Sequence, residues 1–206
     1  LIVHLCMEIR GTTKFIYQGR EIDFTAPWRR LTVHEGIREY AGFEVEGMTE
    51  EMLFAKCKEF GSDLEKPGSR GEMIMELFEL TAEQHLWQPT FVLDHPKEIS
   101  PLTKIHRQDN RKVERFEPFA ACMEIGNAYS ELNDPEDQLA RLKEQEANRG
   151  QDEESHPMDE DFILAIDSGM PPTGGVGIGI ERIVMILTDR PSIRDILFFP
   201  TMKIQT

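Results

Sequence analysis

Cysteine pairs, long apolar runs and an excess of basic residues are all missing from this chain of 206 residues. Cys6, Cys57 and Cys122 are odd in number, lie far apart and form no CxxC pair. They therefore indicate reduced core thiols rather than a disulfide framework or a zinc site. There is no run of 18 apolar residues and no signal peptide, so we expect a cytoplasmic protein without a membrane span.

Positive charge is also scarce, with 23 Lys and Arg against 38 Asp and Glu and a net charge of −15. A broad nucleic-acid-binding surface needs clustered basic residues, so the balance argues against one, although a local basic patch is left open. The apolar content of 39% and charged content of 30% describe an ordinary globular chain of one large domain. Because the sequence starts within an apparent helix, we expect it to begin inside a larger protein.

Short strands and capped helices alternate in the periodic pattern. A hairpin is predicted over residues 13–24, with its turn at Gln18 and Gly19. Helices are predicted at 32–40, 49–60, 71–85, 135–148 and 159–168, strands at 88–93 and within 115–133, and loops at 61–68 and 94–112. The acidic segment 149–157 is predicted to be a mobile link.

Alternating glycines make Gly169–Arg182 the most informative segment. From Gly175 to Ile180, glycines would line one strand face and branched apolar residues the other. Three glycines weaken a strand, which favours a flat ligand lying against the backbone. Arg182 then begins an apolar helix-length run, so the segment suits a nucleotide. The alternative is a tightly packed strand followed by a surface arginine.

A second unusual strand is predicted around residues 126–131. One face would carry Asn127, Tyr129 and Glu131, while the other would carry only the small residues Gly126, Ala128 and Ser130. An amide, an aromatic wall with a hydroxyl and a carboxylate together suit a small amino compound with a cationic group. The alternative is a solvent-exposed edge strand.

Glu117 and Glu124 are seven residues apart, so on one straight strand they would face opposite sides. They would converge only across a bulge, bend or hairpin, which Pro118 makes plausible. Two converging carboxylates suit Mg²⁺ that bridges nucleotide phosphates. Taken as an isolated pair, two glutamates at this spacing are a weak signal, because most such pairs are unrelated surface charges.

Together these stretches resemble the catalytic domain of class II lysyl-tRNA synthetases. The segment G-I-G-I-E-R at Gly177–Arg182 is similar to the third signature motif of the class. Further similar segments follow the family's order and indicate the lysine subgroup: 88–91, 100–102, 124–134, 169–173 and 193–200. The resemblance covers nearly the whole chain and implies an α+β fold, with an antiparallel β-sheet flanked by helices.

The resemblance also implies roles for single residues. Glu117 and Glu124 would hold Mg²⁺ on ATP, and Gly179 would belong to the ATP site. Arg182 would be catalytic, contacting adenine and the terminal phosphate.

A lysine site is implied beside the ATP site. Asn127, Tyr129 and Glu131 would line it, with Glu131 near the positive charges of lysine. Gly177 would let lysine approach the backbone.

The implied reaction is that of a lysine–tRNA ligase. The lysine carboxylate attacks the α-phosphate of ATP, giving lysyl-adenylate and pyrophosphate, and the lysyl group then passes to the 3′ end of tRNA(Lys). ATP, Mg²⁺ and lysine are thus the expected ligands, and catalysis would consist of positioning and electrostatics. The full-length protein would bind tRNA(Lys), and the family leads us to expect a homodimer.

Three parts of the family pattern have no counterpart in this sequence: the first motif with its interface proline, the second motif with its α-phosphate arginine, and the anticodon-binding domain. Residues 1–206 are therefore expected to be the C-terminal portion of the catalytic domain. Each lost preorganised contact costs on the order of 10²–10³ in rate, so the segment alone is expected to be inactive or weakly active. Two alternatives remain: a paralogue that ligates lysine or a relative to a protein, and a non-catalytic ligand-binding module.

Overall fold

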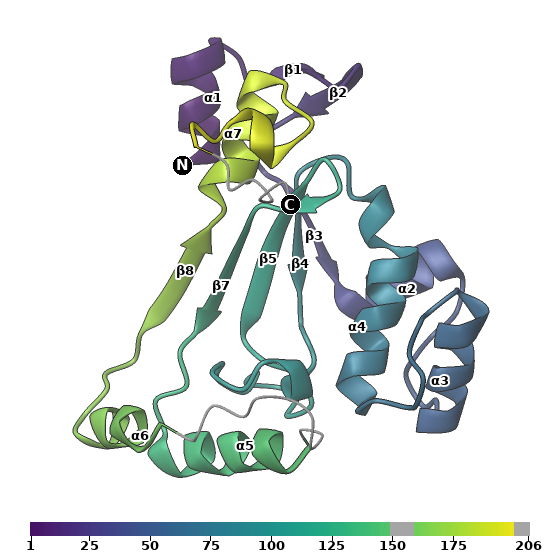
Figure 1. The fold of residues 1–206 in the computed structure, drawn as a ribbon, viewed down its shortest axis with the longest axis vertical. Helices are drawn as coiled ribbons and strands as arrows, with labels where there is room; N and C mark the ends of the chain where they lie inside the picture. The colour runs from purple at the N-terminus through teal and green to yellow at the C-terminus, as the bar shows by residue number, and fades with distance from the viewer. Residues whose placement is uncertain (149–158, 200–206) are drawn as a thin grey trace, which may run out of the picture.

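The computed structural model describes residues 1–148 and 159–199, so the predicted acidic link 149–157 lies outside the described residues. A six-stranded sheet forms its centre (Figure 1). The strands run in the order β3 (Arg29–Thr32), β4 (Thr90–Leu93), β5 (Arg115–Ala120), β7 (Gly126–Ser130) and β8 (Gly174–Ile178), and β6 (Met123–Glu124) pairs with β5. The predicted antiparallel sheet flanked by helices is confirmed, with one addition: β3 and β4 are parallel.

The strand β3 was missed by the sequence analysis. Its sequence is Arg-Arg-Leu-Thr, and only Leu31 is buried. A single buried residue in four gives no alternating apolar pattern. This segment is therefore a strand because it pairs with β4, and not because its residues strongly favour strand conformation. Its last residue, Thr32, caps the helix that follows.

Two groups of elements flank the sheet at separate places (Figure 1). At one end, α1 (Ile2–Arg10), the hairpin of β1 (Lys14–Tyr17) and β2 (Arg20–Asp23), and α7 (Ile180–Thr188) share a core that includes Ile22, Phe24 and Ile186. Beside β3 and β4, the helices α2 (Val33–Ala41), α3 (Glu50–Glu59) and α4 (Arg70–Thr81) build a second core around Ile37, Leu77 and Phe78.

At the opposite end of the sheet, α5 (Pro135–Asn148) and α6 (Glu160–Asp167) lie next to each other (Figure 1). Three short 3₁₀ turns complete the fold: η1 (Glu83–His85), η2 (Lys97–Ile99) and η3 (Ile193–Asp195). The helix predicted over 71–85 is thus α4 followed by η1, and the predicted loop 94–112 contains η2. No helix among the described residues is both long and apolar enough to cross a membrane.

Local sequence signals account for most helix starts. Thr32 and Glu35 form the predicted capping box at α2, and Ser69 and Glu72 form a second one at α4. The Thr49 side chain caps α3. All three cysteines are free, as predicted, although Cys122 is partly exposed while the other two are buried.

Candidate active site

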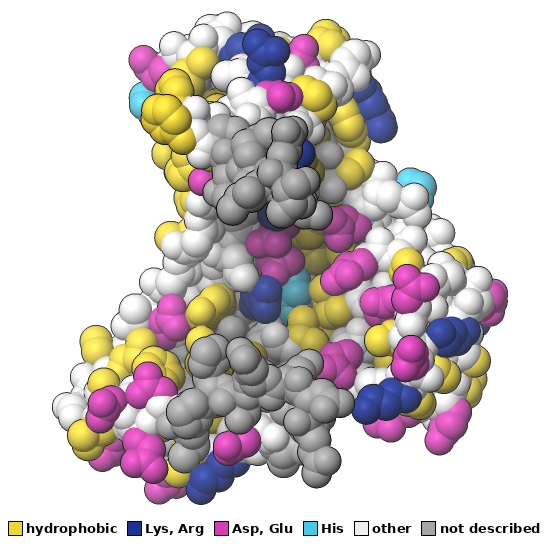
Figure 2. All heavy atoms as spheres, viewed as in Figure 1, with side chains coloured by type: hydrophobic (Ala, Val, Ile, Leu, Met, Phe, Trp, Pro, Cys, Tyr) yellow, Lys and Arg dark blue, Asp and Glu magenta, His cyan; other side chains and the backbone are white. Residues whose placement is uncertain are grey.

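A cleft of about 1350 Å³ opens between the sheet, helix α4 and the loop before α4. Acidic side chains gather around this hollow (Figure 2). The carboxylates that line it come from the loop, α4, η1 and the β5–β6 hairpin, and two arginines join them: Glu65, Glu72, Glu76, Glu79, Glu83, Glu117, Glu124, Arg115 and Arg182. The negative charges that line this cleft repel an anionic ligand unless a cation accompanies the ligand.

The β5–β6 hairpin brings Glu117 and Glu124 to this cleft. Phe119 pairs with Glu124 across the hairpin, so these two residues share a face, and Glu117 lies on that face two residues earlier. The turn at Ala121 and Cys122 has φ of 54° and 58°, as two-residue hairpin loops require. The carboxylates thus converge through a hairpin, one of the routes considered from the sequence.

Both oxygens of the buried Glu117 carboxylate are in contact with basic side chains. Arg115 donates from Nη2 to Oε1, and Nε2 of His95 lies 3.3 Å from Oε2. Burial raises the pKa of Glu117, but the contacts with His95 and Arg115 outweigh it, so the pKa lies below its ordinary value. Glu117 is therefore held as a carboxylate at neutral pH.

Glu124 is more open and is linked to Arg182 at the start of α7. Nη1 of Arg182 donates to the Glu124 carbonyl at 2.6 Å and lies 3.8 Å from the carboxylate atom Oε2. Burial raises the pKa of Glu124, and the charge of Glu117 raises it further. The same two effects, burial first and neighbouring carboxylates second, raise the pKa of Glu79 and of Glu83.

The acidic cleft fits a divalent cation that is completed by other ligands. Within the described residues, no group of three or more His, Cys, Asp or Glu has the arrangement of a metal site. Glu117 and Glu124 lie on one sheet face and are the number of carboxylate ligands that a protein usually gives to Mg²⁺. The remaining oxygen ligands of Mg²⁺ usually come from phosphate and water.

Asn127 and Tyr129 continue the same face of the sheet onto β7. Tyr129 pairs with Arg115 on β5 and with Gly175 on β8, and Asn127 pairs with Gly177. Paired residues of antiparallel strands share a face, so Arg115 joins the cleft to this second group. The Oδ1 atom of Asn127 is buried without a hydrogen-bond partner among the described residues.

Glu131 follows β7 directly, and its carboxylate lies over Gly175. A Cβ atom at residue 175 would overlap Oε1 of Glu131. Beside Gly177 there is open space, because the nearest atom to a Cβ there would be the Asn127 carbonyl oxygen, 3.8 Å away. The glycine that makes room for a protein group is thus Gly175, and the approach of a ligand at Gly177 stays a prediction.

The predicted row of three strand glycines is shorter than expected. The strand β8 ends at Ile178, and Gly179 is the N-cap of α7, with its N–H donating to the Ile125 carbonyl at 3.1 Å. A Cβ at Gly179 would make only ordinary contacts, the nearest at 3.5 Å. This position therefore does not need a glycine for space, and its role toward ATP stays a prediction.

The opposite face of the sheet carries the branched residues. Val176 pairs with Ala128, which pairs with Phe116, and these side chains border a separate apolar hollow of about 380 Å³. Val176 is 71% exposed. The alternative of a tightly packed glycine strand does not hold on this face.

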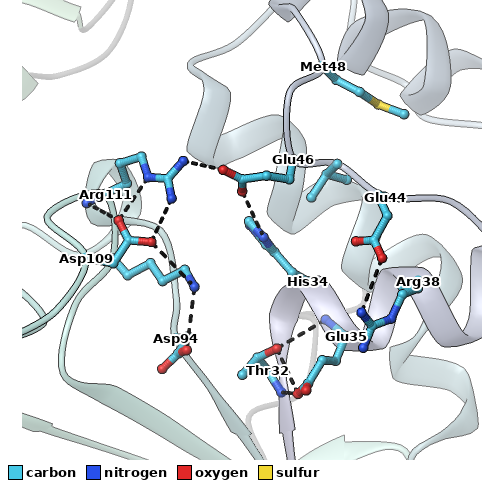
Figure 3. Close-up of polar contacts among 12 residues, drawn as sticks. Thr32, His34, Glu35, Arg38, Glu44, Glu46, Met48, Asp94, Asp109 and Arg111 are labelled. Atoms are coloured by element: carbon cyan, nitrogen blue, oxygen red, sulfur yellow. Dashed lines mark hydrogen bonds and ion pairs between the residues drawn. The ribbon is translucent and has the colours of Figure 1, made fainter.

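A second polar cluster, none of whose residues lines the cleft, ties α2 to the loop before β5 (Figure 3). Glu46 contacts Arg111 and lies 3.6 Å from Nδ1 of His34. Asp109 binds Arg111 and lies 3.6 Å from Nζ of Lys112, which also lies 3.7 Å from Asp94. These contacts link α2 and the segment after it to the loop before β5.

The sequence analysis did not single out His95, Arg115, Glu79, Glu83 or Gly175. A buried histidine and two helical glutamates have no recognisable spacing in one dimension. Of these residues, only Gly175 belonged to a pattern noted in the sequence, the alternating glycines. There the missing side chain was predicted to make room for a ligand, whereas in the structure it makes room for Glu131.

Comparison with known proteins agrees with this geometry. The sequence profile of the family described as tRNA synthetases class II (D, K and N) matches residues 1–203. A lysine–tRNA ligase of Clostridium novyi (strain NT) is 49% identical over 211 residues, covering 98% of this chain and 41% of that protein.

Two further relatives with the same name come from other organisms. The protein of Moorella thermoacetica is 48% identical over 205 residues, covering 98% of this chain and 42% of the relative. The protein of Methanoculleus marisnigri is 49% identical over 205 residues, covering 98% and 40%. The chain thus spans about two fifths of the length of these relatives.

Proposed function

The chain belongs to the class II tRNA synthetases (D, K and N), and we propose that it forms the part of a lysine–tRNA ligase that holds ATP, Mg²⁺ and lysine. The observation that carries this proposal is the shared sheet face. Glu117 and Glu124 on the β5–β6 hairpin adjoin Asn127 and Tyr129 on β7, with Arg115 between the two groups. A nucleotide and an amino acid bound side by side on this face would meet near Arg115.

ATP is assigned to the cleft. Mg²⁺ held by Glu117 and Glu124 would bridge phosphate oxygens and offset the negative wall. Arg182 stands at the cleft rim with a side chain that is 48% exposed, so its guanidinium is accessible for the adenine ring and the terminal phosphate. The backbone at Gly179 would lie at the same end, where α7 begins.

Lysine is assigned to the β7–β8 surface. The Glu131 carboxylate would attract its ammonium groups, Tyr129 would form an aromatic wall, and the free Oδ1 of Asn127 would accept a hydrogen bond. Gly177 would leave the backbone open to the substrate. A cationic side chain is therefore favoured over an apolar one of similar length.

The proposed chemistry is activation of lysine. With lysine and ATP aligned, the lysine carboxylate attacks the α-phosphate, forming lysyl-adenylate and releasing pyrophosphate. The chain's own residues contribute positioning and charge, and none of them needs to form a covalent bond to the substrate. Transfer to tRNA(Lys), homodimer formation and the full reaction are proposed for the longer protein, of whose relatives this chain matches only about two fifths.

Two matched variants test this assignment by calorimetric titration of the chain with lysine and with MgATP. Glu131→Gln is expected to weaken lysine by about 10-fold or more and leave MgATP within about twofold, because a charge-assisted contact is worth about 1.5–3 kcal/mol. Arg182→Ala is expected to show the reverse. Equal losses for both ligands in either variant would contradict the two assigned subsites.

Pyrophosphate exchange into ATP with each amino acid then tests the chemistry. Exchange that depends on lysine would establish activation by the chain alone. Binding without exchange would support the ligand sites and place the rest of the reaction in the longer protein. Exchange or binding that favours an uncharged amino acid would overturn the lysine assignment.

A further inference from the structure

His95 is a fully buried histidine next to Glu117, one of the residues that line the acidic cleft. It is 0% exposed and follows β4, with its main-chain carbonyl accepting from the N–H of Val113 at 3.0 Å. Its Nε2 atom lies 3.3 Å from Oε2 of Glu117, and neither ring nitrogen has a partner in hydrogen-bond geometry among the described residues. The carboxylate of Glu117 is therefore the polar neighbour that this imidazole faces.

The other oxygen of the carboxylate is held independently. Arg115 donates from Nη2 to Oε1 of Glu117, and its Nη1 donates to the Ser100 hydroxyl at 2.8 Å. Ser100 is itself buried. Three residues from two separate chain segments thus fix Glu117, with one basic side chain on each of its oxygens.

A carboxylate held in this way keeps capacity for a metal ion. Each of its two oxygens can accept about two hydrogen bonds or one bond and one cation, so a single donor on each oxygen leaves a lone pair unused. Groups that hold a metal ligand from behind orient it, and their loss commonly weakens the metal site. Arg115 alone, contacting one oxygen, would leave the carboxylate free to rotate about its last bond.

Burying the polar imidazole of His95 would be unfavourable if it did not help to orient Glu117. Buried polar atoms without a hydrogen-bond partner oppose folding, and both ring nitrogens of His95 are in that position; of the two, Nε2 is the one next to a charged group. An apolar side chain would fill the same space without that cost. The geometry indicates that the benefit lies on the Nε2 side, at Glu117.

We propose that His95 is a positioning residue for Glu117: with Arg115, it holds the carboxylate so that its unused lone pairs face a divalent cation in the cleft. This inference rests on the proposed function, because it takes Glu117 as a metal ligand. The tautomer with its proton on Nε2 is the one whose N–H would be directed at Glu117, 3.3 Å away. His95 itself touches neither cation nor nucleotide.

The test uses Mn²⁺ as the probe, with ATP present, and measures its binding to the full chain by electron paramagnetic resonance. His95→Gln places an amide N–H near the position of Nε2, whereas His95→Asn places one near Nδ1. The two variants are similar in polarity, so they separate donor position from general burial effects. Glu117→Gln serves as the reference for loss of the ligand, and ATP binding in EDTA reports the nucleotide site without metal.

We expect His95→Asn to weaken Mn²⁺ by about 10–100-fold, as loss of an orienting group does, and His95→Gln to stay within a few-fold of the native chain. Metal-free ATP binding should change in neither variant. Circular dichroism shows whether each variant is folded. If one is not, His95→Tyr, which carries a donor, replaces the Gln variant, and His95→Leu, which carries none, replaces the Asn variant.

Two results overturn the inference alone. One is native Mn²⁺ affinity in His95→Asn while Glu117→Gln has lost it, and the other is equal loss in the Gln and Asn variants. If the native chain binds no Mn²⁺ with ATP, or if Glu117→Gln binds it as tightly as the native chain, the metal site of the proposed function fails, and this inference fails with it.

Discussion

The carboxylate of Glu131 lies over the backbone of Gly175, so close that a Cβ atom at residue 175 would overlap its Oε1 atom. Gly175 pairs with Tyr129, and Glu131 follows two residues later, so the three residues meet at one point of the β7–β8 surface. Burial raises the pKa of Glu131. The absence of a side chain at Gly175 therefore allows the Glu131 carboxylate, the negative charge of the candidate lysine site, to occupy its position.

Gly175→Ala is expected to displace Glu131 without unfolding the chain, because the atom that the new methyl meets belongs to the end of a flexible side chain. Lysine affinity should fall by about 10–100-fold, as for a lost charge-assisted hydrogen bond, and MgATP affinity should stay within about twofold. Calorimetric titration measures both. Gly174→Ala is the control, since its Cβ would meet only the Tyr129 carbonyl oxygen at 3.9 Å. Native lysine affinity in Gly175→Ala would show that Glu131 is not needed there.

Glu83→Gln is expected to stabilise the chain at neutral pH. Burial, and then the charges of Glu79, Glu117 and Glu124, raise the pKa of Glu83 above 4.5. A carboxylate whose pKa is raised by folding opposes folding when ionised, so this penalty is present above the raised pKa and vanishes below the unfolded value. Urea unfolding at pH 7 and pH 4 should show a gain that disappears on acidification. Glu8→Gln on exposed α1 is the control. A gain that persists at pH 4 would contradict the electrostatic cause.

His34 should make the chain less stable as the pH falls. Burial, followed by the charge of Lys112, lowers the pKa of His34 below 6.5, although Glu46 opposes this shift (Figure 3). The unfolded chain then takes up its proton first, so stability declines between pH 6.5 and the lower folded pKa. His34→Gln is expected to flatten this part of the profile in thermal unfolding from pH 7.5 to 5. His4→Gln, at an exposed position on α1, should leave the slope as it is. An unchanged slope in His34→Gln would rule out the buried imidazole as its source.

Asp189 holds the β1–β2 turn against the end of α7. Its Oδ1 atom accepts from the backbone N–H of Gln18 at 2.7 Å and from Nε2 of Gln18 at 2.9 Å. Asp189→Ala should cost about 1 kcal/mol in the free energy of unfolding, because the Gln18 N–H loses its acceptor and Nε2 of Gln18 keeps only the Asp189 carbonyl at 3.2 Å. Asp189→Asn keeps an acceptor and the tolerance of asparagine for the left-handed backbone at φ 56°, so it should cost less. Equal losses in the two variants, measured by urea unfolding, would argue against the shared oxygen.

Sequence patterns were most reliable where they describe contacts between near neighbours. The Thr32–Glu35 capping box, the hairpin turn at Gln18 and the apolar, helix-length run after Arg182 were all noted in the sequence, because each depends on residues within one or two turns of chain. The strand β3 was missed and the glycine row was read one residue too long. Both errors arise because strand limits depend on a partner strand that is distant in sequence.

The candidate site shows the same division. Residue type and order alone singled out Glu117, Glu124, Asn127, Tyr129, Glu131 and Arg182 and indicated a family. Which of these share a face was decided by the register of β5, β6, β7 and β8, which a one-residue shift would reverse. His95 is far from Glu117 in the sequence and Arg115 lies two residues before it, yet the two side chains contact the two oxygens of the Glu117 carboxylate.

The sequence by itself determined the family, the helix caps, the turn positions and the identity of the charged groups, since these depend on local chemistry and on motif order. Only the tertiary structure decided how those groups meet. Long-range strand pairing placed Glu117 beside His95, and it placed Glu131 over Gly175. The physical reason is that burial and electrostatic interactions depend on distances in space. Those distances are fixed only when strands that are far apart in the sequence pair with one another.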